Sequence, residues 1–255
     1  MLTKYDLDAK GTGHVFLKKK QLVDITSEFQ KIEISDLDIL GRVLVLDNII
    51  QLSELDCDRY HETFAHLPMS CVEAPTRALV LGGGDGILAK ELLKYEGLEI
   101  DIVDIDESVC TLSAKYLSHL NDDAFGSARV YLYNEDAIKF CKDTDKKYDV
   151  IFGDITDPHP DSPSNSLLGV GAIEIYKKRL KPGGILAIQT DNPQIAPEHF
   201  VTVKKTLSKC FSQVGDFATV ALTLSSVVKY PAARSALLHK TIARESSDDT
   251  GVPAS

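Results

Sequence analysis

The segment LVLGGGDG, residues Leu79–Gly86, decides the fold. A short apolar run typical of a buried β-strand leads directly into a glycine-rich turn, and a helical pattern follows over 88–95. Glycines in such a turn let the backbone approach a ligand closely. A glycine-rich turn alone is a weak signal, so its meaning depends on the strands around it.

From Arg77 onward the sequence alternates between short apolar strands and helices. The expected strands are RALVLGG, LEIDIVDID, ARVYLYN, YDVIFGD and GGILAIQTD, and two more are expected near 214–223 and 234–240. Further helices are expected over 107–117 and 169–180, and KPGG after them is typical of a helix stop and a turn. The alternation predicts an α/β fold, a parallel, doubly wound, Rossmann-like sheet of the class I methyltransferase type.

The N-terminal residues follow another pattern. The segments HVFLKKKQLVDI, FQKIEI and GRVLVLDNIIQLSE are extended and apolar, with short polar breaks between them. They predict a small N-terminal antiparallel β module over 1–55. The Rossmann-like domain is expected over 56–242, and the polar tail over 243–255 is expected to be disordered.

A helix is expected at the joint between the two parts. In DCDRYHETFAHLPMS, Tyr60, Phe64 and Leu67 fall at helical spacing, while Asp56 is placed to cap the start and Pro68 to end the helix. Residues at this spacing most often belong to a core, so the pattern alone favours a structural role for Tyr60.

The composition disfavours several classes of function. Of 255 residues, 28 are Lys or Arg and 38 are Asp or Glu, which gives a net charge of -10. Nucleic acids and anionic membranes attract basic proteins, so neither is expected as a partner. The acidic balance suits a cationic small substrate, although solubility alone explains such a charge more often.

The cysteines and the apolar runs indicate the compartment. The five cysteines are scattered without the spacing of metal ligands, so we expect buried thiols in a reducing cytoplasm and no metal site. The N-terminus lacks the pattern of a signal peptide, and no apolar run approaches the ~18 residues of a membrane span.

Carboxylates follow the expected strands. Asp104, in VDID, comes about 20 residues after the glycine turn, where an acid takes ribose hydroxyls in nucleotide-binding sheets. Asp136, in NEDA, is placed either to face an adenine edge or to cap a helix, and the residues leave both open. Asp85 lies inside the glycine turn and would repel a pyrophosphate. A sulfonium nucleoside fits better, best of all one without the carboxylate of S-adenosylmethionine.

The fourth strand delivers still more acids in DVIFGDITDPHPD, which holds Asp154, Asp157 and Asp161. In open α/β sheets, ligands bind at the carboxyl ends of the strands. Neighbouring carboxylates raise each other's pKa, which suits a general base. The plainer alternative is that Asp154 caps a helix and Asp157 makes a turn with Pro158.

Five motifs in this order resemble the spermidine synthase (polyamine aminopropyltransferase) family over about residues 29–193: GRVLVLDNIIQLSELDCDRYHETFAHLP, LVLGGGDG, VDID, NEDA and DITDP. The resemblance implies transfer of the aminopropyl group of decarboxylated S-adenosylmethionine to an amine, with release of methylthioadenosine. Putrescine, giving spermidine, is the default acceptor. It also implies a cytoplasmic homodimer or homotetramer, with the β module in the interface and no cofactor beyond the co-substrate.

The resemblance assigns roles to individual residues. It gives the catalytic work to Asp154 as proton acceptor, Asp157 as its partner and Tyr60, which orients the attacking amine. It gives nucleoside binding to Gln30, Gly82, Gly83, Gly84, Asp85, Asp104, Asp136 and Ala137. It gives the amine to Gln51, His61, Asp157, Gln189 and Tyr230. By its residue type alone, His61 is more often a hydrogen-bonded core histidine.

The chain departs from the family pattern in places. Ile87 replaces the last glycine of GGGDGG, and Asp104 replaces a glutamate. The loop after Asp157 is longer and carries Asp161, and Arg234 lies where a diamine would be unfavourably placed. Two alternatives therefore stay open: a paralogue that uses S-adenosylmethionine or another nucleophile, and a non-catalytic nucleoside-binding relative. A dinucleotide-dependent oxidoreductase is a minor alternative.

Overall fold

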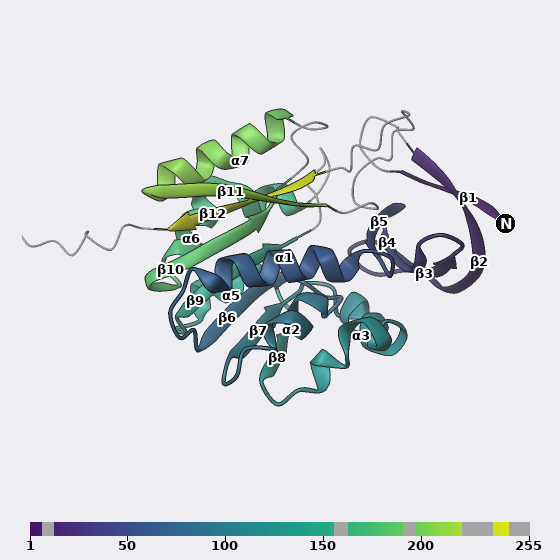
Figure 1. The fold of residues 1–255 in the computed structure, drawn as a ribbon, viewed down its shortest axis with the longest axis horizontal. Coiled ribbons are helices and arrows are strands. Elements are labelled where there is room, and N and C mark those ends of the chain that lie inside the picture. The colour runs from purple at the N-terminus through teal and green to yellow at the C-terminus, as the bar shows by residue number, and fades with distance from the viewer. Residues whose placement is uncertain (7–12, 156–162, 191–196, 221–236, 245–255) are drawn as a thin grey trace, which may run out of the picture.

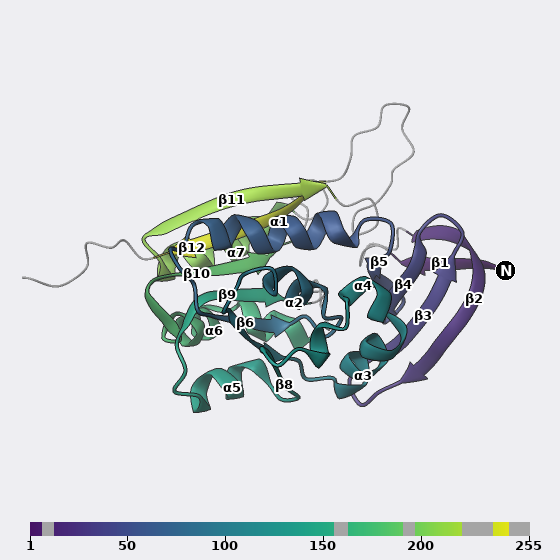
Figure 2. The ribbon, with the colours of Figure 1, turned by 60° about the horizontal axis from the view of Figure 1, so that its bottom comes forward.

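The computed structural model describes residues 1–6, 13–155, 163–190, 197–220 and 237–244 (Figure 1). A five-stranded barrel at the N-terminus is followed by a seven-stranded sheet with helices on both faces. The long helix α1 (Cys57–Ser70) runs from the barrel along the sheet (Figure 2). No helix in the described residues is long and apolar enough to cross a membrane.

The barrel contains two strands more than the three expected segments: one precedes them, and GRVLVLDNIIQLSE forms two strands that pair with each other. Its strands are β1 (Leu2–Asp6), β2 (Gly13–Thr26), β3 (Lys31–Leu37), β4 (Gly41–Leu46) and β5 (Ile49–Ser53). Successive strands pair antiparallel, and a parallel contact between Asp6 and Ile49 closes the barrel. Tyr5 holds β1 in place because its ring is fully buried and its hydroxyl donates to Glu33.

The main sheet has the order β11-β12-β10-β9-β6-β7-β8. Its strands are β6 (Arg77–Gly82), β7 (Glu99–Val103), β8 (Val130–Tyr133), β9 (Tyr148–Asp154), β10 (Leu180–Gln189), β11 (Gln213–Val220) and β12 (Leu237–Arg244). The doubly wound α/β prediction is confirmed, but the sheet is mixed because β12 runs antiparallel to both neighbours. The pairing partner of a strand is a long-range choice that local periodicity does not encode.

Two boundaries differ from the expectations. β12 extends through Arg244, so residues 243–244 belong to the sheet rather than to the tail, and 245–255 lie outside the described residues. KPGG falls within the span of β10, where the pairing register shifts between Leu180 and Ile185. Gly183, with φ of 74°, makes this irregularity.

The helices cover both faces of the sheet. They are α1, α2 (Ile87–Leu92), α3 (Glu107–Tyr116), α4 (Ser118–Asn121), α5 (Ala137–Asp143), α6 (Val170–Lys177) and α7 (Pro197–Cys210), with 3-10 turns at Ala124–Gly126 and Pro163–Leu168. α1 and α2 pack on one face of the sheet, and α5, α6 and α7 on the other. Ile87, the departure in the glycine motif, is the first residue of α2 and is fully buried.

Helix α1 corrects three expectations. Pro68 is buried inside the helix, which continues to Ser70, and only the last turn loses a hydrogen-bond donor. Leu67 is 43% exposed, so the buried stripe follows Tyr60, Phe64 and Pro68 instead. Asp56 occupies the N-cap position without a capping bond, because its carboxylate accepts from Ser53 Oγ.

The cysteines are free, and four of them are buried as expected, but Cys71 is exposed. It follows the last turn of α1, beyond the stripe that packs on the sheet. The absence of a disulfide among the five agrees with the scattered spacing in the sequence.

Candidate active site

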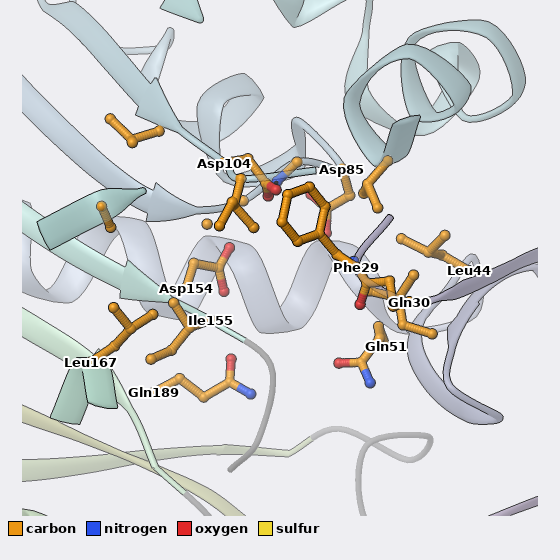
Figure 3. A pocket seen from close by; sticks show the side chains of 18 of the residues that line it. Phe29, Gln30, Leu44, Gln51, Asp85, Asp104, Asp154, Ile155, Leu167 and Gln189 are labelled. Carbon is orange, nitrogen blue, oxygen red and sulfur yellow. Dashed lines mark hydrogen bonds between the residues drawn. The ribbon is translucent and has the colours of Figure 1, made fainter. Parts of the chain in front are cut away.

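A cavity of about 360 Å³ lies at the carboxyl ends of β6, β7 and β9, where the barrel meets the sheet (Figure 3). Every predicted site residue in the described part of the chain lines it: Gln30, Gln51, Tyr60, His61, Gly82, Gly83, Gly84, Asp85, Asp104, Asp136, Ala137, Asp154 and Gln189. Asp157 and Tyr230 lie outside the described residues, as do Asp161 and Arg234.

The glycine turn draws three strand ends together. Gly82 and Gly83 have φ of 82° and 72°, which side chains rarely adopt. A Cβ on Gly82 would lie 2.2 Å from the Asp154 carbonyl oxygen, and one on Gly84 would lie 2.6 Å from Asp104 Oδ2. The absence of side chains here therefore lets the backbone at the end of β9 and the carboxylate of Asp104 approach the turn.

Backbone amides hold two of the carboxylates that line the cavity, those of Asp104 and Asp85. Gly84 N donates to Asp104 Oδ2 at 3.0 Å, and Asp106 N donates to Asp104 Oδ1 at 2.9 Å. Burial raises the pKa of Asp104 to about 6 in spite of these donors. Asp85 Oδ1 accepts from Ile87 N at 2.8 Å, and burial likewise raises the pKa of Asp85 to about 6.

The carboxylate of Asp154 lies beside the hydroxyl of Tyr60. Helix α1 is fixed on the sheet by Phe64, whose ring packs edge-on against Phe152 of β9 with centroids 5.5 Å apart. One turn earlier, the Tyr60 hydroxyl reaches Asp154 Oδ1 at 3.3 Å and also contacts Gln189 Oε1. Tyr60 belongs to the core, as its helical spacing predicts, and it also lines the cavity.

His61 is likewise both a core residue and a cavity residue. It is buried, and its Nδ1 lies 2.7 Å from the Cys57 carbonyl oxygen, which can only accept. Nδ1 therefore carries the proton, and Nε2 faces Asp85 Oδ2 at 3.9 Å. The hydrogen-bonded core histidine that residue type favours is present, with its second nitrogen at the cavity.

Models of known families match both parts of the chain. The spermine/spermidine synthase domain matches residues 57–237, and the spermidine synthase tetramerisation domain matches residues 3–54. The chain belongs to the spermidine synthase family. The two matches meet at the joint between β5 and α1, where the cavity is closed by the barrel.

Curated relatives are named polyamine aminopropyltransferases. A polyamine aminopropyltransferase of Oceanobacillus iheyensis is 38% identical over 185 residues, which are 71% of this chain and 36% of that protein. A polyamine aminopropyltransferase of Prochlorococcus marinus is 35% identical over 197 residues, covering 76% of this chain and 69% of the relative. This chain thus spans about a third of the first relative and two thirds of the second.

Solved structures share the fold. A spermidine synthase in complex with the transition state analogue AdoDATO superposes with a TM-score of 0.88 at 24% identity, over 97% of this chain and 81% of that chain. Spermidine synthase from Thermotoga maritima superposes with a TM-score of 0.85 at 24% identity, over 97% of this chain and 80% of that chain. At this identity the likeness concerns the fold alone.

In this member of the spermidine synthase family, Asp136 caps a helix, which is one of the two roles that its sequence position left open. As the N-cap of α5 it accepts from Lys139 N at 2.7 Å. It also lines the cavity beside Ala137. An N-cap carboxylate at the carboxyl end of a strand is held rigidly, so the helix start can present its second oxygen to a ligand.

The sequence pattern missed the apolar walls of the cavity. Leu44, Leu46 and Ile49 of the barrel line it, and Phe29 and Ile105, about half exposed, lie at its rim. Leu44 and Leu46 alternate in β4 and therefore share a face, which signals burial but not a site. Ile105 carries a usable signal, because an apolar residue between the acids of VDID follows the end of a buried strand.

Proposed function

We propose that this protein is an aminopropyltransferase that moves the aminopropyl group of decarboxylated S-adenosylmethionine to a primary amine, putrescine by default, and releases methylthioadenosine. The charge of the cavity supports this most strongly. Its described lining contains Asp47, Asp85, Asp104, Asp136 and Asp154, and neither Lys nor Arg. Such a cavity favours a sulfonium and ammonium groups, and it disfavours phosphates and carboxylates.

The nucleoside would occupy the side of the cavity near the glycine turn. Asp104 would accept the ribose hydroxyls, and Asp136 with the start of α5 would face the adenine edge. Phe29 and Ile105 offer apolar surface that a purine ring would cover. Gln30 reaches the same side from the barrel, so the nucleoside would bridge both parts of the chain (Figure 3).

The amine would lie between Asp154, Tyr60, Gln51 and Gln189. A primary amine has a pKa of about 10 and arrives protonated, so it cannot attack until a base takes its proton. Asp154, whose Oδ1 lies 3.3 Å from the Tyr60 hydroxyl, would accept that proton while this hydroxyl would orient the nitrogen. The nitrogen then forms a bond to the aminopropyl carbon, the carbon–sulfur bond breaks, and its electron pair neutralises the sulfonium. Asp157 and Tyr230 are proposed to complete this side.

The cavity bears on the alternatives. Intact S-adenosylmethionine would place its carboxylate where the described lining offers no cationic side chain and where Asp85 is buried. A dinucleotide would bring its phosphates close to Asp85, whose negative charge would repel them. A purely nucleoside-binding relative needs no acid beside Tyr60, yet Asp154 lies there. The described residues also contain no group of three His, Cys, Asp or Glu that could hold a metal ion.

An endpoint assay by mass spectrometry tests the proposal. The purified protein is mixed with decarboxylated S-adenosylmethionine and, separately, with putrescine, cadaverine, agmatine, spermidine or no amine, and a parallel set contains intact S-adenosylmethionine. Methylthioadenosine together with an aminopropylated amine is the expected result. Product only from intact S-adenosylmethionine would favour the paralogue, and binding without product would favour the non-catalytic relative.

We expect nucleoside affinity to weaken in acid. The carboxyl of Asp104, with its pKa raised by burial to about 6, is ionised above that pH and accepts two hydroxyls, whereas its protonated form loses an acceptor. The Kd of methylthioadenosine should therefore rise about tenfold per pH unit below about 6. Calorimetric titration from pH 8 to pH 5 measures it. Asp104→Asn should bind weakly with a flat profile, and a flat profile in the unaltered protein would contradict this role.

We propose that the barrel joins copies of the chain in a homodimer or homotetramer in the cytoplasm. Its family model is described as a tetramerisation domain. Leu2, Val15 and Leu17 are exposed by 71%, 60% and 47% and share one face of the β1–β2 pair. Leu17→Glu should shift the sedimentation of the protein to smaller species. A monomer in the unaltered protein would contradict this assembly.

A further inference from the structure

Asp106 joins the two parts of the chain without lining the cavity. Its side chain is buried, with 1% of the residue exposed, and Oδ1 caps helix α3 by accepting from Ser108 N at 3.0 Å. Its other oxygen accepts from the barrel: from Ser27 Oγ at 2.7 Å and from Gln30 Nε2 at 3.0 Å. One carboxylate therefore fixes a helix start and a barrel turn to each other.

The barrel turn held in this way carries two cavity residues. Ser27 Oγ accepts from Phe29 N and Gln30 N, each at 3.1 Å, and so organises the turn between β2 and β3. Phe29 and Gln30 line the cavity, whereas Ser27 and Asp106 stand behind them. Since Asp106 N also donates to Asp104 Oδ1, the same residue orders both sides of the nucleoside end.

The bond from Gln30 to Asp106 also decides which way the Gln30 amide faces. An ionised carboxylate only accepts, so Nε2 must face Asp106 and Oε1 is left as the acceptor on the other side. A nucleoside brings two ribose hydroxyls, and Oε1 of Gln30 would share one of these donors with Asp104.

We propose that Asp106 is a positioning residue for the nucleoside, which orients the Gln30 amide and seats Phe29 at the rim; this rests on the proposed function. The residue acts through Gln30 and Phe29, so its loss should weaken nucleoside binding and leave the transfer step almost unchanged. Asp106→Asn keeps the helix cap, because asparagine caps helices as well as aspartate does. The amide then faces Gln30 with a donor, which turns Oε1 of Gln30 towards residue 106 and away from the nucleoside.

A matched control lies at the other end of α3. Arg42 of the barrel donates from Nη1 to the Tyr116 carbonyl oxygen at 2.6 Å and pairs with Asp36. It also ties the barrel to this helix, but it does not line the cavity. Arg42→Gln therefore weakens the attachment of the barrel without touching the turn that carries Gln30.

The test compares methylthioadenosine binding by calorimetry with steady-state kinetics in the full chain. Asp106→Asn should raise the Kd about tenfold, or about 1.4 kcal/mol, and change kcat less than about twofold. Ser27→Ala leaves both the Asp106 cap of α3 and the bond from the Gln30 amide to Asp106 in place, and it should raise the Kd about threefold. Arg42→Gln should leave the Kd within about twofold of its original value. Adding Gln30→Glu to Asp106→Asn gives residue 30 two acceptor oxygens, one for the amide at position 106 and one for the nucleoside, and should return most of the affinity.

Each result decides between positioning and a purely structural role. Equal loss of affinity in Asp106→Asn and Arg42→Gln, or no recovery with Gln30→Glu, would overturn the proposal. If the unaltered protein fails to bind methylthioadenosine, the proposed function fails instead. Hydrogen exchange at the backbone amides of residues 27–30, measured without ligand, then still tests the bonds from Asp106 to Ser27 and Gln30. Asp106→Asn should speed this exchange and Arg42→Gln should not.

Discussion

Replacing Asp154 by asparagine should lower kcat for aminopropyl transfer by about 10³-fold, because an amide has almost the same shape but cannot take a proton from an ammonium at neutral pH. The residue ends β9 and lies 3.3 Å from the Tyr60 hydroxyl, inside a cavity whose described lining offers no Lys or Arg. The nucleoside end of the cavity is built by other residues, so methylthioadenosine should bind within about threefold of its original affinity.

Single-turnover kinetics with saturating co-substrate measure this loss, and calorimetry measures the binding. Tyr60→Phe is a graded comparison, since it removes one hydroxyl while the ring stays in the core beside Phe64, and it should cost about tenfold in kcat. If Asp154→Asn keeps its turnover, Asp154 is not the base. If it loses binding and turnover together, the carboxylate holds the cavity open rather than accepting a proton.

Local rules explain why much of the site could be predicted. Gly82 and Gly83 are required by backbone conformation, and the acids that follow β6, β7 and β9 meet because parallel strands end at one edge. Strand type and strand end are both readable within a few residues of sequence. The convergence of Asp104 and Asp154 on one cavity therefore follows from their positions at strand ends, given that β6, β7 and β9 are parallel.

Long-range pairing explains what could not be predicted. β12 enters the sheet between β10 and β11, and β1 closes the barrel. The hydrophobic periodicity of the local sequence indicates neither placement. The contribution of Leu44 and Leu46 to the cavity depends on how the barrel docks on α3. Asp106 directly precedes the helix expected over 107–117, and its bonds to Ser27 and Gln30 cross more than 70 residues of chain.

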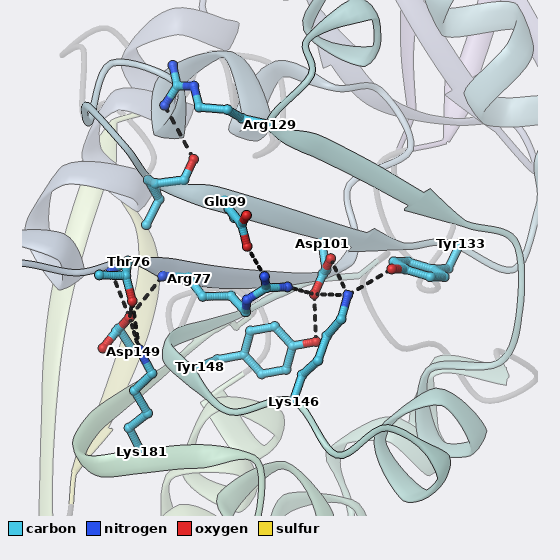
Figure 4. Close-up of polar contacts among 11 residues, drawn as sticks. Thr76, Arg77, Glu99, Asp101, Arg129, Tyr133, Lys146, Tyr148, Asp149 and Lys181 are labelled. Atoms are coloured by element: carbon cyan, nitrogen blue, oxygen red, sulfur yellow. Dashed lines mark hydrogen bonds and ion pairs between the residues drawn. The ribbon is translucent and has the colours of Figure 1, made fainter.

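Far from the cavity, Asp101→Asn should give the largest loss of stability, about 3–4 kcal/mol in the free energy of unfolding. Asp101 is fully buried on β7, and its two oxygens each accept from Lys146 Nζ at 3.0 Å (Figure 4). Tyr148 Oη donates at 2.8 Å and Arg77 Nη1 at 3.2 Å.

An amide at this position would replace one acceptor by a donor that faces only donors, and it would leave two cations without their buried partner. Urea unfolding followed by circular dichroism should show a lower midpoint with an unchanged slope. Asp143→Asn is the matched control, because its ion pair with Lys139 is exposed and should contribute less than about 0.5 kcal/mol. A loss below about 1 kcal/mol for Asp101→Asn would mean that Lys146 and Arg77 turn to solvent, and that burial of this carboxylate contributes little to holding β6, β7 and β9 together.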